Sequence, residues 1–141
     1  MNSQIIKAVY FSSTGRLGRL AYFGYALALG VAFFVAAAIL TMLLGMVGLI
    51  LSMVLYLGVL YCEYNVAAKR FQDLNQPGQY ALYMMGIAFL SGVLSRIGSL
   101  ELVGSLLSLL VLVAALYLLF VPGTAGANTY GPAPDALPDA Q

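Results

Sequence analysis

The sequence contains no histidine and no tryptophan, and its one cysteine is Cys62. Without histidine, neither a Ser-His nor a Cys-His catalytic pair can form, and no His/Cys cluster is available to hold zinc. The sequence also has no glycine-rich phosphate loop and no dinucleotide-binding fingerprint. A single cysteine cannot close an internal disulfide, and its apolar neighbours indicate a small packed side chain. These absences predict a protein that is not an enzyme and that uses no metal and no cofactor.

Charge is also scarce, since only 8% of the residues are charged and the net charge is +1. A balance so close to zero does not favour nucleic acid as a partner. Hydrophobic residues make up 62% of the chain, far above the share found in soluble domains. No Asp, Glu, Lys or Arg occurs between Leu20 and Cys62, a run about twice the ~20 residues that cross a bilayer once. The composition therefore predicts a protein embedded in a lipid bilayer.

Short breaks divide the apolar sequence into segments of membrane-spanning length. We expect four spanning helices, at residues 20–44, 49–67, 79–95 and 102–121. The third is short and contains Ser91, Gly92 and Ser95, so it either thins the bilayer locally or inserts only in part. The predicted fold is all-α, a compact four-helix membrane bundle over residues 1–121 followed by a Pro/Gly-rich tail over 122–141.

The first 18 residues precede the apolar run, and we expect them at the membrane surface. Ser12, Ser13 and Thr14 offer hydroxyl groups that cap a helix starting near Gly15. A signal peptide is the alternative, because the three alanines at 36–38 resemble a cleavage site. The charged region is too long for that interpretation, and the apolar run continues past the alanines.

The basic residues predict the orientation of the chain. With four spans, one side of the membrane holds all but one of them, namely Lys7, Arg16, Arg19, Lys69 and Arg70. The other side holds Arg96. The positive-inside rule then places both termini in the cytoplasm. Most tyrosines fall near the same ends of their spans, as in an aromatic belt at the membrane interface.

Small residues recur every fourth position along the first span, at Gly24, Ala28, Ala32 and Ala36. Inside lipid, helices associate where small side chains let their backbones approach. The stripe predicts a packing seam, used either within the chain or between two copies in a homo-oligomer. Gly104 and Ser108 form a second such pair in the fourth span.

The few charged residues around the second polar break predict a cluster. Its expected members are Arg16, Arg19, Glu63, Lys69, Arg70 and Asp73. Glu63 lies six residues deeper than Lys69, roughly 9 Å along a helix, so its carboxyl group must pair with a base or stay protonated. The cluster either locks helix ends together or forms a site for a lipid headgroup, an ion or a proton.

Three separated motifs resemble those of the DUF805 family of small bacterial inner-membrane proteins. They are FSSTGRLGRLAYF at 11–23, AKRFQDLNQPG at 68–78 and VPGTAGANTYGP at 121–132. The resemblance implies a four-helix membrane domain, with the third motif forming a loop that includes Tyr130. It places the family's signature residues at Gly15, Arg16, Arg19, Arg70, Asp73, Gly123, Gly126, Asn128 and Gly131. All three motifs lie on one predicted side of the membrane.

This chain departs from the family pattern at several positions. The family commonly has a charged residue where Ala21 stands, a histidine where Gln72 stands, a glycine where Asn75 stands and tryptophan near Gln79 and Tyr80. A metal or proton role of that histidine cannot transfer to this chain.

We expect a non-enzymatic, multi-pass protein of the bacterial inner membrane that scaffolds or modulates a partner membrane protein, or that binds anionic lipid headgroups. The alternative is a carrier or channel subunit for a small solute, an ion or a proton, using Glu63 paired with arginine.

Overall fold

The computed structural model describes residues 3–134 of the chain, and in that range it is built from helices. They are α1 (Ser3–Tyr10), α2 (Arg19–Leu44), α3 (Met46–Asp73), α4 (Tyr80–Leu94) and α5 (Glu101–Phe120), with a 3₁₀ turn at Gly98–Leu100. The one β-type pairing in this part of the chain is an isolated bridge between Asn128 and Gly131. The all-α prediction is confirmed.

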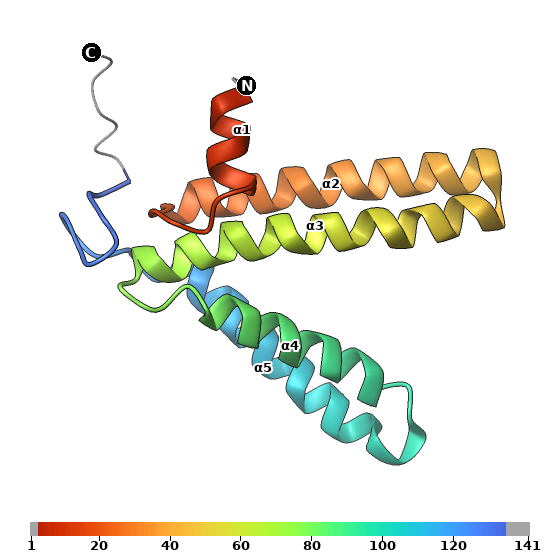
Figure 1. The fold of residues 1–141 in the computed structure, drawn as a ribbon. Coiled ribbons are helices and arrows are strands. Elements are labelled where there is room, and N and C mark those ends of the chain that lie inside the picture. The colour runs from red at the N-terminus through yellow and green to blue at the C-terminus, as the bar shows by residue number, and fades with distance from the viewer. Residues whose placement is uncertain (1–2, 135–141) are drawn as a thin grey trace.

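The long helices form two antiparallel hairpins, α2 with α3 and α4 with α5 (Figure 1). Gly45 joins α2 directly to α3 with φ of 56°, a left-handed value that glycine adopts without strain. Beside this turn, a Cβ atom on Gly48 would overlap the backbone carbonyl of Leu40. The sequence places glycine where these two backbones approach most closely.

The predicted compact bundle is wrong, because the two hairpins meet near the C-terminal end of α3 and then diverge (Figure 1). Large apolar side chains remain exposed on both hairpins, including Tyr56 (43%) of α3 and Phe89 (76%) of α4. Helices in lipid have no strong hydrophobic drive to close such a gap, so apolar composition alone did not determine their packing.

Three helical segments are long and apolar enough to cross a membrane, namely Arg19–Leu44, Met46–Asp73 and Gly98–Phe120. Helix α4 has 15 residues and is roughly 22 Å long, which is less than the ~30 Å thickness of a bilayer core. Three such segments indicate a multi-pass membrane protein. A fourth span remains a prediction.

The N-terminal helix prediction is wrong. No helix starts near Gly15; instead, α1 ends at Tyr10, and α2 begins at Arg19 after an irregular segment. The hydroxyl group of Ser12 accepts a hydrogen bond from the backbone N–H of Thr14 at 3.3 Å, so it stabilises a local turn instead of a helix cap.

Helix α1 packs against α3, and its last residue contributes to a small core. The Tyr10 hydroxyl donates to the backbone carbonyl of Tyr25 at 3.0 Å. Burial raises the pKa of the Tyr10 phenol, which keeps this donor protonated. Cys62 is half-buried against the same core, as a small packed side chain should be.

The second span extends further than expected, because α3 continues through the polar break to Asp73. Asn75 then adopts φ of 59°, a left-handed conformation that asparagine tolerates better than most residues. The family that the sequence motifs resemble commonly has glycine at this position. The chain reverses here and enters α4.

The two small-residue patterns have different outcomes. Gly24, Ala28 and Ala32 are exposed, so most of the predicted stripe on α2 does not pack within the chain. On α5, Gly104 is buried, and a Cβ atom there would overlap Ser95 of the preceding connection. The Ser108 hydroxyl lies 3.2 Å from the Ser91 hydroxyl of α4. The Gly104–Ser108 seam is confirmed.

Candidate functional site

Three charged side chains meet where the two hairpins join. Arg16 donates from Nε to the Asp73 carboxylate at 3.0 Å, and its Nη2 lies 2.9 Å from the same oxygen, Oδ1. Arg70 pairs with the other oxygen, Oδ2. The side chains of Arg16, Asp73 and Arg70 are 1%, 2% and 0% exposed. The structure therefore brings these three predicted residues together as a buried Arg16–Asp73–Arg70 cluster.

Arg70 also connects α3 to the end of α5 through hydrogen bonds. Its Nε donates to the backbone carbonyl of Leu118 at 2.7 Å, and its Nη2 donates to that of Val121. The last carbonyl groups of a helix have no partner inside the helix, so a guanidinium group with several N–H donors suits them well. Arg70 caps α5 while it pairs with Asp73.

The predicted loop motif wraps around Arg16. The Arg16 guanidinium donates to backbone carbonyls of Thr124 at 2.6 Å, of Gly131 at 3.3 Å and of Gly126. Asn128 holds the loop in place, because its side-chain amide donates to the Gln72 carbonyl of α3 at 2.8 Å.

Two further contacts fix the shape of this loop. The backbone N–H of Tyr130 donates to the Asn128 side chain at 2.8 Å, and the Thr124 N–H donates to the Asp73 carbonyl at 2.9 Å. A Cβ atom on Gly123 would overlap the Asp73 carboxylate, so only glycine fits there without a shift. The motif residues give the backbone room to approach the cluster and supply carbonyl groups that accept hydrogen bonds from Arg16.

Lys69 belongs to a separate contact, contrary to the predicted single cluster. Its ammonium group donates to the backbone carbonyls of Val9, at 2.9 Å, and of Ala8. Both carbonyls lie in the last turn of α1, where a cation is favoured by the unpaired carbonyl groups. Lys69 attaches α1 to α3.

Sequence reasoning missed two neighbours of Lys69, Asn65 and Gln72. The Asn65 amide donates to the Tyr10 carbonyl at 2.8 Å, and the Gln72 amide donates to the Ser13 carbonyl at 2.9 Å. Both are buried, and with Lys69 they repeat at positions i, i+4 and i+7 on one face of α3. That spacing of polar residues at the end of an apolar helix was a usable signal for a face that binds backbone.

Glu63 and Arg19 stand apart from the cluster, where the prediction had included them. Within residues 3–134, neither forms an ion pair or a side-chain hydrogen bond. Glu63 is half-buried, and it interacts electrostatically with Tyr22 of α2, which also interacts with Arg70. Arg19 is exposed at the start of α2. Glu63 is thus an acid on an apolar helix without a bonded partner in the described part of the chain.

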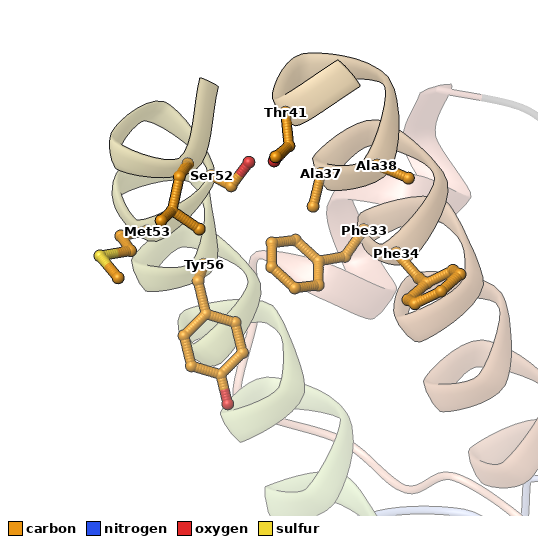
Figure 2. A pocket seen from close by; sticks show the side chains of 9 residues that line it. Phe33, Phe34, Ala37, Ala38, Thr41, Ser52, Met53 and Tyr56 are labelled. Atoms are coloured by element: carbon orange, nitrogen blue, oxygen red, sulfur yellow. The ribbon is translucent and has the colours of Figure 1, made fainter. Parts of the chain in front are cut away.

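A second feature lies on the α2–α3 hairpin, further from the cluster. An open apolar groove of about 540 Å³ lies between the two helices. The Phe33 and Tyr56 rings meet within its lining, with their centroids 5.2 Å apart (Figure 2). The Thr41 and Ser52 side chains close one end, and the Ser52 hydroxyl donates to its own helix, at the Gly48 carbonyl. The groove has the chemistry to take an apolar group and offers almost no polar atoms.

The cluster is suited to fixing helix positions. Its cations are already surrounded by a carboxylate and several backbone carbonyls, so they are not free to bind a headgroup. No group of three or more potential metal-binding side chains occurs within residues 3–134.

Comparison with known proteins gave one family. The sequence profile of a family described as "Protein of unknown function (DUF805)" matches residues 10–132. No curated protein and no solved structure shows a significant match.

Proposed function

Because the chain belongs to the DUF805 family, whose description names no activity, we propose a function from its geometry: a non-enzymatic, multi-pass scaffold for a partner membrane protein. The family resemblance supports a bacterial inner membrane as its location. The distribution of basic residues supports an orientation with both termini in the cytoplasm.

The observation that carries this proposal is the rigid junction from which two apolar hairpins diverge (Figure 1). The Arg16–Asp73–Arg70 cluster connects the segment before α2, the end of α3 and the end of α5. Buried ion pairs are often no more stabilising than apolar packing, but they do fix geometry when every polar group is satisfied. A fixed angle between hairpins keeps helix faces available to another membrane helix.

Photo-crosslinking in native membranes tests the proposal. A photoreactive phenylalanine analogue at Tyr56 reports on the face that lines the groove, and the same analogue at Val31 reports on the outer face of α2. We expect a discrete protein adduct from position 56 and only lipid adducts from position 31. Lipid adducts alone from both positions would contradict the scaffold.

The second candidate is a carrier for a proton or a small cation, and it is favoured by Glu63. An ionisable side chain within a membrane helix is a functional candidate by default. Purified protein in liposomes should show no flux if it is a scaffold. A proton or cation flux that disappears in Glu63→Gln would contradict the scaffold function and support the carrier function.

A further inference from the structure

One line of side chains on α3 runs from the groove to the cluster. Leu49, Tyr56, Glu63 and Arg70 recur every seven residues, which keeps them on nearly the same face of a helix, with a drift of about 20° per step. Leu49 and Tyr56 line the groove. Arg70 reaches the end of α5. We call this line of residues the inner face of α3.

Most of this inner face is uncovered. Leu49 is 42% exposed and Tyr56 is 43% exposed. Glu63 comes two turns after Tyr56 along α3, toward its C-terminal end. Arg70 is bonded to Asp73 and two backbone carbonyls, and Lys69 is bonded to the end of α1. Arg19 is exposed at the start of α2 and forms no ion pair with Glu63 within residues 3–134. The Glu63 carboxyl group is therefore available to a group that binds on the inner face.

The distance along the face limits what that occupant can be. Ser52 in the groove and Glu63 are eleven residues apart, roughly 16 Å along the helix axis. Tyr56, the groove residue nearest the polar end of α3, lies thirteen residues, roughly 20 Å, from Lys69 at that end. One leaflet of a ~30 Å hydrocarbon core is about 15 Å thick, so a lipid of one leaflet cannot meet both features. A membrane-spanning helix can.

We propose that the inner face binds a transmembrane helix of another protein that carries a lysine or arginine opposite Glu63 and an apolar side chain in the groove. This inference rests on the proposed scaffold function and names the chemistry of its partner. The partner's cation pairs with Glu63, an acid within a membrane helix that forms no ion pair in residues 3–134. The groove accepts a side chain about eleven residues away along the partner helix. In lipid, an acid and a base inside the membrane are expected to pair with one another.

Synthetic guest helices test this pairing with the full chain in nanodiscs. The first guest is a Leu/Ala transmembrane peptide with one lysine eleven residues from one phenylalanine. The second has leucine in place of the lysine, and the third has the lysine moved to four residues from the phenylalanine. Energy transfer between labelled protein and labelled peptide measures binding. We expect the first guest to bind about fivefold more tightly than the other two, as for an interhelical polar contact in a membrane.

Variants of the chain provide the matched controls. Glu63→Gln should remove the preference for lysine and leave the binding of the leucine guest unchanged. Ala37→Phe fills the groove and should weaken all guests, whereas Ala28→Phe on the exposed outer face should weaken none. Because the guests vary while the protein stays the same, the comparison among guests does not depend on how well a variant folds.

The outcomes separate this inference from the scaffold proposal. Equal binding of the lysine and leucine guests would overturn the Glu63 pairing and leave the scaffold proposal standing. Failure of every guest to bind, together with lipid-only adducts at position 56, would overturn both. Two labelled copies of the chain could also show energy transfer with each other. If Ala37→Phe abolished that transfer, the proposed partner helix would be overturned, because a second copy would then occupy the inner face.

Discussion

At the scale of single residues, the junction depends on arginine and could not be built equally well from lysine. The guanidinium of Arg70 donates separate N–H groups to the carbonyls of Leu118 and Val121 and to the Asp73 carboxylate. Arg16 donates to Asp73 and to carbonyls of the loop. A lysine ammonium offers three donors from one atom and cannot reach in several fixed directions. Charge and hydrogen-bond geometry are both used at these positions.

Replacing Asp73 by asparagine should destabilise the protein strongly. The change leaves two buried guanidinium groups without a counter-charge, and breaking a buried ion pair in this way costs about 3–5 kcal/mol. The free energy of unfolding in detergent micelles measures the effect. Arg96→Gln, at an exposed residue far from the cluster, is the control and should change it by no more than about 0.5 kcal/mol. Equal stability of both variants would show that the cluster is not a structural element.

At the scale of elements, the hairpins rely on glycine where backbones touch. Helix α3 contains Gly48, where an added methyl group meets the Leu40 backbone, and Gly58, which has open space around its Cα atom. The contact at Gly48 involves backbone atoms, which cannot rotate away as a side chain can. Position within the helix, and not glycine content, decides whether a substitution is tolerated.

Gly48→Ala should therefore destabilise the α2–α3 hairpin by about 1–3 kcal/mol, the usual cost of overpacking. Gly58→Ala adds the same methyl group to the same helix without a clash and should be neutral, or stabilising by up to about 1 kcal/mol. Thermal unfolding of the two variants in identical micelles makes the comparison. A larger loss for Gly58→Ala would contradict the observed packing of α2 on α3.

At the scale of the whole molecule, the polar contacts gather at one end and the apolar surfaces diverge from it (Figure 1). The segment before α2, the end of α3 and the loop after α5 all meet at the cluster. This arrangement fits two hairpins inserted from the same membrane face. It also leaves the Gly98–Leu100 turn at the far end of the shorter hairpin.

Cysteine labelling in intact cells tests this topology, in a Cys62→Ala background so that no other thiol reacts. Ser3→Cys and Thr129→Cys should resist a membrane-impermeant maleimide until the cells are permeabilised. Ser99→Cys should react from outside, as expected if α4 and α5 both cross the membrane. Labelling of Ser3→Cys and Thr129→Cys from opposite sides would refute the four-span arrangement.

The sequence alone determined that the chain is helical, apolar and organised around a few charged residues. Periodicity and composition are local properties, so they predicted α5 and the pairing of Arg16, Arg70 and Asp73. They did not predict that Lys69 binds the end of α1 instead of joining this cluster, or that Glu63 forms no ion pair in the described part of the chain. Those results depend on which backbone carbonyls lie within reach.

Only the tertiary structure decided how the hairpins are placed. Lipid solvates apolar helix faces almost as well as another helix does, so a hydrophobic sequence is compatible with both a closed bundle and two diverging hairpins. The direction of each hairpin comes from the contact of Gly123 with Asp73 and from the Arg16–Asp73–Arg70 cluster. Such contacts join residues far apart in the chain, and a local pattern can name the residues but does not give the geometry in which they meet.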